Sequence, residues 1–212
     1  MLIKKLAHQL SKYDDIIFDL DNTLFDQSDY DIGAFKEIEK ILSEITQLPL
    51  KGLAIFLHTH KLKMGVLHPY LFNDAIAAYE LPNHYLSIML NTYYKHDGKY
   101  ISKKASLIPT LFEILDEKRL FVVTNGQKNV QQTKIDRLQL NNYVCDIVLC
   151  DPKSPERLKP NRYAFDLLNK RHKLNSVVMV GDTTETDGLF AKNAKIPFIH
   201  FSYKDYLHEN TK

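Results

Sequence analysis

The sequence predicts an α/β fold: a doubly wound, Rossmann-like parallel sheet core with a helical insert after the first strand. Five short apolar runs are hydrophobic throughout instead of alternating with polar residues, which is typical of strands that helices cover on both faces. Amphipathic stretches separate the later runs, as crossover connections between parallel strands require. Roughly a hundred residues lie between the first and second runs, far more than one crossover helix needs.

The five apolar runs define the expected strands. They are rich in β-branched and aromatic residues, and they lie at Ile16–Leu20, Leu120–Thr124, Asp146–Cys150, Val177–Gly181 and Pro197–Phe201. The last four follow one another with room for a single helix between neighbours, which indicates one sheet of the doubly wound type.

Three helices are expected, one before the second strand and two between the later strands. Apolar residues recur every three or four positions over Pro109–Arg119, Asn129–Leu138 and Pro160–Arg171. The third stretch opens with Pro160, and proline suits the first position of a helix.

The long gap predicts a second unit. An apolar stripe runs from Ile32 to Ile45, and helical patterns recur over Leu71–Leu81 and Tyr85–Tyr94. We therefore expect residues 31–105 to fold as a small helical bundle, while residues 1–30 and 106–212 form the α/β core.

Composition excludes several classes of protein. The 212 residues are 44% apolar and 25% charged, which is typical of a globular chain and not of a disordered one. The formal net charge is only +2, which argues against an extended surface for a nucleic acid polymer. The chain contains no run of 18 apolar residues, so no membrane span is expected, and its first residues do not resemble a signal peptide.

The two cysteines, Cys145 and Cys150, lie in an apolar run and are expected to be buried free thiols, as suits the reducing cytoplasm.

Candidate catalytic and ligand-binding residues follow the expected strands. Acidic pairs come after the first and fourth strands in the segments FDLDNTL and GDTTETD, a Thr-Asn pair ends the second strand, and a lysine precedes the third core helix. These residues are Asp19, Asp21, Thr124, Asn125, Lys159, Asp182 and Asp187. The carboxyl ends of parallel strands meet at one edge of the sheet, where α/β folds bind ligands. Two carboxylates so close in sequence are costly unless a positive charge lies between them, because like charges repel.

Taken in order, these segments resemble the motifs of the haloacid dehalogenase (HAD) superfamily, and specifically of its phosphatase branch. The pattern DxDxT at Asp19–Thr23, the strand-terminal Thr124, the lysine before a helix and the final GDxxxxD carry the resemblance. The helical insert is similar to the C1-type cap of that superfamily. The run Thr124-Asn125-Gly126 followed by Gln131 is similar to the pyrimidine 5′-nucleotidase-like subgroup.

The resemblance implies a Mg²⁺-dependent phosphatase that hydrolyses a small phosphate monoester through an aspartyl-phosphate intermediate. Asp19 would be the nucleophile. Asp21 would protonate the leaving alcohol and then accept a proton from the attacking water, so it must be protonated while Asp19 is ionised. Lys159 would neutralise the nucleophile and the phosphate.

The same resemblance implies a metal site and a phosphate site. Asp19, the backbone carbonyl of Asp21 and Asp182 would hold Mg²⁺, which prefers oxygen ligands. Asp187 would orient the lysine or a metal-bound water. For the phosphoryl oxygens, the ligands would be Thr124 and the backbone amide of Asn125.

Three alternatives stay open at this point. A 2-haloacid dehalogenase needs neither Mg²⁺ nor an acid two residues after the nucleophile, whereas this chain has Asp21 there. A phosphomutase usually carries Gly-Val or Gly-Thr after the second aspartate, where this chain has Asn22-Thr23. A phosphate-binding scaffold without turnover would not need the full set of catalytic residues. The sequence leaves nucleoside monophosphates and sugar or polyol phosphates both open as substrates, and it predicts no oligomeric state.

The insert contributes further candidates. Lys61, Lys63 and His68 lie in the loop-like stretch HTHKLKMGVLHPY, where they either form a solvated basic face or bind an anionic substrate. His58 and His60 have the spacing of a metal-binding pair, but two histidines without further ligands are weak evidence for a site.

Overall fold

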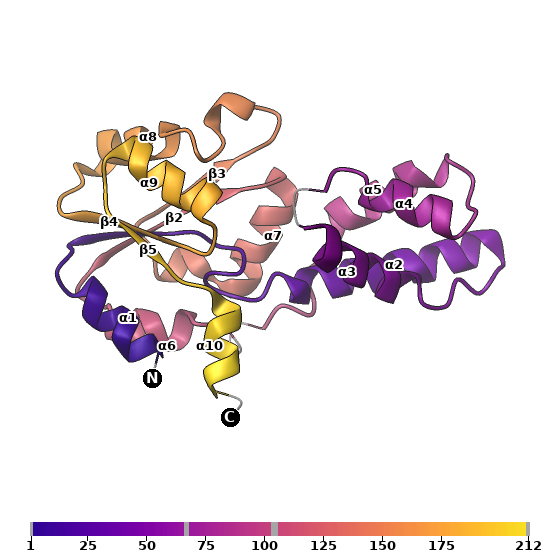
Figure 1. Ribbon diagram of the computed structural model, residues 1–212, viewed down its shortest axis with the longest axis horizontal. Helices are drawn as coiled ribbons and strands as arrows, with labels where there is room; N and C mark the ends of the chain where they lie inside the picture. The colour runs from indigo at the N-terminus through magenta and orange to yellow at the C-terminus, as the bar shows by residue number, and fades with distance from the viewer. Residues whose placement is uncertain (1, 66–67, 103–105, 211–212) are drawn as a thin grey trace. The chain divides into compact units, whose positions relative to one another are not determined.

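One parallel sheet forms the centre of the α/β core, as the sequence predicts. In the computed structural model, which describes residues 2–65, 68–102 and 106–210, the strand order is β3-β2-β1-β4-β5 (Figure 1). The strands are β1 (Asp15–Phe18), β2 (Arg119–Asn125), β3 (Asp146–Cys150), β4 (Val177–Gly181) and β5 (Phe198–His200). Each pair of neighbours is parallel. The chain winds outward from β1 first to one edge and then to the other, so β1 lies at the point where the strand order reverses.

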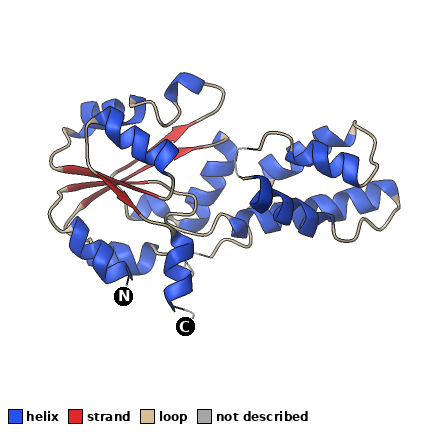
Figure 2. Ribbon diagram, in the orientation of Figure 1, coloured by secondary structure: helices blue, strands red, loops and turns tan. Residues whose placement is uncertain are grey.

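Helices cover both faces of this sheet (Figure 2). They are α1 (Leu2–Leu10), α6 (Ile108–Ile114), α7 (Lys128–Leu138), α8 (Tyr163–His172) and α9 (Leu189–Ala194). The last helix, α10 (Tyr203–Asn210), contacts α1. On one face, Ala164 and Leu168 of α8 and Phe190 of α9 pack against Ile17 and Phe121 of the central strands. Burial of these strands on both faces explains why their sequences are apolar throughout.

Two details of the core differ from the sequence-based expectations. The third core helix begins at Tyr163, so Pro160 lies in the preceding turn and not at the first helical position. Cys145 is exposed, although Cys150 is buried as expected. Cys145 lies one residue before β3 begins, outside the part of the apolar run that the sheet buries.

The insert between β1 and β2 is entirely helical among the residues described. It contains α2 (Ser28–Thr46), α3 (Leu53–Met64), α4 (Leu71–Ala78) and α5 (Tyr85–Lys95). The chain divides into two compact units, residues 28–101 and residues 1–27 with 102–212. The predicted boundary at residue 105 falls outside the described residues.

The helical unit has its own core. Phe35 and Leu42 of α2 pack with Leu53 and Leu57 of α3 and Met89 of α5. The loop-like interpretation of the stretch from His58 was wrong up to Met64, because these residues continue α3. In the described part of the chain, no helix is long and apolar enough to cross a membrane.

Candidate functional site

A buried lysine joins two carboxylates at the carboxyl end of the central strand. Asp19 follows β1 directly, and its backbone amide donates to the carbonyl of Val180 in β4. Lys159 Nζ lies 2.5 Å from Asp19 Oδ1 and 2.6 Å from Asp187 Oδ1. All three side chains are at least nine-tenths buried. Lys159 thus supplies a positive charge between one carboxylate from each of the two acidic segments.

The backbone of Lys159 is also held in place. Asn125, the last residue of β2, donates from Nδ2 to the Lys159 carbonyl at 2.9 Å and accepts from the Lys159 amide at 2.8 Å. The Asn125 side chain therefore fixes the segment that delivers the lysine, in addition to the role predicted for its backbone amide.

Asp182 and Asp187 come from the turn after β4. Asp187 lies in a single π-helical turn, Thr184–Gly188, and its Oδ2 accepts from the Thr183 amide at 3.2 Å. Gly181 leaves room for this carboxylate, since a Cβ there would lie 2.3 Å from Asp187 Oδ2. Thr183 Oγ1 donates to Asp182 Oδ1 at 3.1 Å. Both oxygens of Asp187 are thus engaged by protein donors.

The electrostatics of this cluster favour a bound cation. Burial raises the pKa of the Asp19 carboxyl to about 8; Lys159 opposes this shift, while Asp187 and Asp21 add to it. Burial also raises the pKa of Asp182. Burial disfavours the charge on Lys159, but Asp19 and Asp187 together raise the pKa of the lysine above its ordinary value. One lysine therefore does not compensate the negative charge gathered here.

The donor atoms suit a hard cation. One carboxylate oxygen from each of Asp19, Asp182 and Asp187 lies within 4.8 Å of the others. Oxygen ligands are those that Mg²⁺ prefers, and its charge would offset the carboxylates. Asp187 binds Lys159 and the Thr183 amide, and Asp19 binds Lys159 and accepts from the Thr23 hydroxyl at 3.4 Å. Asp182, which accepts from the Thr183 hydroxyl, is therefore the least engaged ligand of the three.

Asp21 has partners of its own, separate from those of Asp19. Lys134 Nζ lies 2.7 Å from Asp21 Oδ1 and 2.8 Å from Oδ2, and Gln131 Nε2 lies 2.8 Å from Oδ2. Lys134 is 1% exposed. Both partners lie on α7, which begins just after β2.

Gln131 links Asp21 to the end of β2. Its Nε2 also lies 2.6 Å from Thr124 Oγ1 and 3.0 Å from the Asn125 carbonyl. An amide carries only two N–H hydrogens, so these contacts share them. Gly126 allows the approach, since a Cβ at that position would lie 2.9 Å from the Gln131 side chain.

The structure thus connects all seven residues singled out in the sequence within the α/β unit. Lys134 is the residue that sequence reasoning missed. A signal was present: Lys134 falls on the face of α7 that carries Val130, Ile135 and Leu138, where a buried lysine needs a partner.

Comparison with known proteins decides the family. The sequence pattern of the haloacid dehalogenase-like hydrolases matches residues 16–201, which is most of the chain. The chain belongs to this family. This haloacid dehalogenase-like hydrolase carries its acidic segments directly after β1 and β4.

Curated relatives of this hydrolase include N-acylneuraminate-9-phosphatases. The enzyme from Rattus norvegicus is 25% identical over 197 residues, covering 84% of this chain and 77% of the relative. The Homo sapiens enzyme is 27% identical over 198 residues with the same coverage.

Solved structures share the fold of this hydrolase. A proposed HAD hydrolase of Bacillus subtilis, YfnB, whose crystal structure contains magnesium, superposes with a TM-score of 0.62 at 15% identity, covering 95% of this chain and 100% of its own. A proposed beta-phosphoglucomutase from Thermotoga maritima gives a TM-score of 0.63 at 17% identity, covering 89% and 86%. At such identities these similarities establish the fold alone.

Proposed function

We propose that this hydrolase is a Mg²⁺-dependent phosphatase of small phosphate monoesters that works through an aspartyl-phosphate intermediate. The observation that carries the proposal is the separation of the two carboxylates after β1. Asp19 contacts Lys159, whereas Asp21 contacts Lys134 and Gln131. Two carboxylates in different environments can take different protonation states. Burial favours the protonated form of Asp19 in the metal-free protein, so the proposal requires a cation beside Asp19 to favour its ionised form before it attacks phosphorus.

The first step needs both aspartates. An oxygen of Asp19 attacks phosphorus, the bond from phosphorus to the leaving oxygen breaks, and Asp21 donates a proton to that oxygen. Lys159 neutralises charge on the nucleophile and on the phosphoryl group. In the second step water attacks the phosphorus of the aspartyl-phosphate while Asp21 accepts a proton from it. The bond between phosphorus and the Asp19 oxygen breaks, which releases inorganic phosphate and returns Asp19 to its carboxylate form.

The remaining residues position the phosphate and the cation. Asp19, Asp182 and the backbone carbonyl of Asp21 would hold Mg²⁺, which supplies positive charge beside the phosphate when bound. Thr124 and the backbone amide of Asn125 would donate hydrogen bonds to phosphoryl oxygens. Asp187 would keep Lys159 in place, in line with the 2.6 Å contact between them. Magnesium in the structure of the Bacillus subtilis relative supports the choice of ion.

Two classes of substrate fit this proposal. The name of the curated relatives, N-acylneuraminate-9-phosphatase, favours a phosphorylated sugar or polyol. The similarity of the Thr124–Gly126 segment and Gln131 to the pyrimidine 5′-nucleotidase-like subgroup makes nucleoside monophosphates the second class. Both are small esters with an alcohol as leaving group, for which a general acid is required.

A screen of phosphate monoesters with Mg²⁺ tests the proposal. We expect phosphate release from at least one sugar or polyol phosphate, or from a nucleoside monophosphate. Asp19→Asn should abolish turnover without unfolding the protein, because it keeps the shape of the side chain but removes the nucleophile. Asp116→Asn is the matched control, since Asp116 is exposed on the surface, and it should keep full activity.

A second readout tests the intermediate itself. Rapid acid quench during turnover should trap phosphate on the wild-type protein, and mass spectrometry should place it on Asp19. Retention of more than about a hundredth of the wild-type rate in Asp19→Asn would contradict a covalent role for this residue.

A further inference from the structure

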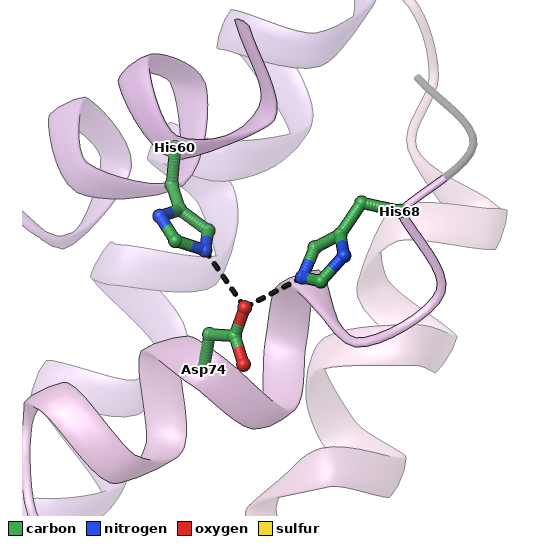
Figure 3. A group of neighbouring side chains, drawn as sticks. All are labelled: His60, His68 and Asp74. Carbon is green, nitrogen blue, oxygen red and sulfur yellow. Dashed lines mark hydrogen bonds and ion pairs between the residues drawn. The ribbon is translucent and has the colours of Figure 1, made fainter. Parts of the chain in front are cut away.

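Three side chains of the helical unit converge outside the candidate site. His60 lies in the last part of α3, His68 in the connection that follows, and Asp74 in the first turn of α4 (Figure 3). His60 Nε2 lies 2.7 Å from Asp74 Oδ2, and His68 Nε2 lies 2.6 Å from the same oxygen. Two imidazole nitrogens thus point at one carboxylate oxygen.

This donor set differs from the oxygen cluster of the α/β unit. Imidazole nitrogen suits Zn²⁺ and neighbouring first-row ions, whereas Mg²⁺ and Ca²⁺ prefer oxygen. Two histidines with one carboxylate are a known ligand set of zinc sites, in which water takes the fourth position. In this chain the three donor atoms lie within 4.8 Å of one another.

The surroundings hold the two rings toward the carboxylate. Phe56, one helical turn before His60, stacks on its ring with centroids 5.2 Å apart and an angle of 10°. The His60 and His68 rings meet edge to face at 5.7 Å. The three side chains keep between 16% and 35% of their surface exposed. An ion can therefore reach ligands whose orientation is already restricted.

Two of the three separations between donor atoms require only a small adjustment, and the third, between the two imidazole nitrogens, is within 4.8 Å. Around a tetrahedral ion with ligands at about 2.0–2.1 Å, donor atoms stand ~3.3 Å apart. The separations of 2.6 and 2.7 Å found here would have to widen by roughly 0.6 Å, which small side-chain rotations can supply. All three ligands lie between residues 60 and 74, so the site is complete within the α3–α4 hairpin.

We propose that His60, His68 and Asp74 bind one first-row transition-metal ion, with Zn²⁺ the best match, and that this ion fastens α3 to α4. The pair is therefore not His58 with His60, the spacing seen in the sequence, but His60 with a histidine eight residues later. The site is independent of the proposed phosphatase chemistry, because its ligands belong to the helical unit alone.

The alternative is that the same residues form only hydrogen bonds and ion pairs. Titration calorimetry of the metal-free full chain with Zn²⁺ separates the two cases, with millimolar Mg²⁺ present to compete at the carboxylate cluster. We expect one equivalent of Zn²⁺ to bind to the wild type and to raise the melting temperature by several degrees. His60→Gln, His68→Gln and Asp74→Asn should each weaken binding at least tenfold and remove that rise.

Two controls make the outcome specific. His58→Gln, two residues away on α3, should bind Zn²⁺ like the wild type, and so should Asp182→Asn, which lacks a ligand of the carboxylate cluster. Absence of Zn²⁺ binding in the wild type, or binding that the three variants leave unchanged, would overturn the proposal. Loss of binding in His58→Gln or Asp182→Asn to the same extent would also overturn it.

A measurement on the unmodified sequence removes any dependence on the folding of the variants. In the full chain labelled with ¹⁵N-histidine, Zn²⁺ should shift the Nε2 resonances of two of the nine imidazoles, those of His60 and His68. No shift, or shifts confined to other histidines, would contradict the assignment.

Discussion

At the scale of single residues, Lys134 fixes the position of Asp21. Its ammonium contacts both carboxylate oxygens, and Gln131 adds a third contact. We expect Lys134→Met to lower kcat for alkyl phosphate esters by about 10–10²-fold, because the proton donor loses its anchor; full loss of a general acid costs about 10²–10⁴-fold. With p-nitrophenyl phosphate, whose leaving group departs without a proton, the first step should slow much less.

The same substitution at an exposed lysine is the control for this prediction. Lys170 is exposed at the end of α8, so Lys170→Met should leave both substrates unaffected. Equal losses of Lys134→Met on the two substrates in single-turnover measurements would show that the lysine supports folding and does not position the acid.

Asp19 should make the stability of the metal-free protein depend on pH. The pKa of its carboxyl rises from 3.8 to about 8 on folding, mainly through burial. The folded state therefore binds more protons than the unfolded state between these values, so the free energy of unfolding falls as pH rises from about 4 to 8. Urea denaturation in EDTA at pH 5, 6.5 and 8 should show this fall in the wild type and a smaller one in Asp19→Asn. The same change with pH in the wild type and in Asp19→Asn would contradict a contribution from Asp19.

At the scale of elements, Lys61 connects α3 to α2 inside the helical unit. Lys61 Nζ lies 2.6 Å from Asp31 Oδ2, and the Tyr93 hydroxyl donates to Asp31 Oδ1 at 2.7 Å. The Lys61 side chain is 13% exposed and that of Asp31 is 6% exposed. The structure thus gives Lys61 an internal partner, which weakens the hypothesis that it binds the substrate.

We expect Lys61→Met to destabilise the protein by about 2–4 kcal/mol, because it leaves a buried carboxylate without its cation. Lys63→Met should change stability by less than about 0.5 kcal/mol, since Lys63 is exposed. Thermal denaturation of the two variants measures the difference. An unchanged melting temperature in Lys61→Met, accompanied by a raised KM, would restore the substrate-binding hypothesis.

The strands were predictable because burial on both faces leaves a direct mark in sequence, a short run without polar interruption. Helix α3 left no such mark. Its buried residues include Leu53 and Leu57, while Ile55 and Leu62 are more than half exposed, which blurs the amphipathic pattern.

The polar residues of the candidate site were predictable from their position after strands, but their partners were not. Asp19 and Lys159 are 140 residues apart, and only the sheet topology brings them into contact. Lys134 was missed because a lysine on a helix is ordinarily solvated, and its burial depends on an aspartate from another element. The convergence of His60 and His68 on Asp74 likewise depends on contact between α3 and α4, which the sequence does not show.

At the scale of the whole molecule, Mg²⁺ should stabilise the protein as well as activate it. An ion that binds only the folded state at 100 times its Kd adds about 2.7 kcal/mol to the free energy of unfolding. EDTA should therefore abolish turnover and lower the melting temperature, and Mg²⁺ should reverse both effects. Ca²⁺ should not restore activity, because it takes more and looser oxygen ligands.

Asp182→Asn provides the control for this experiment. It removes a proposed ligand, so the concentration of Mg²⁺ needed for half-maximal activity should rise at least tenfold. Full activity after exhaustive chelation would instead favour chemistry of the dehalogenase type, which needs no metal.

The helical unit should restrict the substrate to small molecules. It begins at Ser28, with six residues between it and Asp21 in the sequence. We expect this unit to act as a mobile lid, and such lids exclude water and bulky groups from enzyme sites. We expect kcat/KM for the preferred small ester to exceed that for a phosphorylated protein such as phosphocasein by at least 10³-fold. Free phosphoserine should be assayed alongside, because poor hydrolysis of both would report on the leaving group and not on size. Comparable rates for phosphocasein and the small ester would overturn the restriction to small substrates.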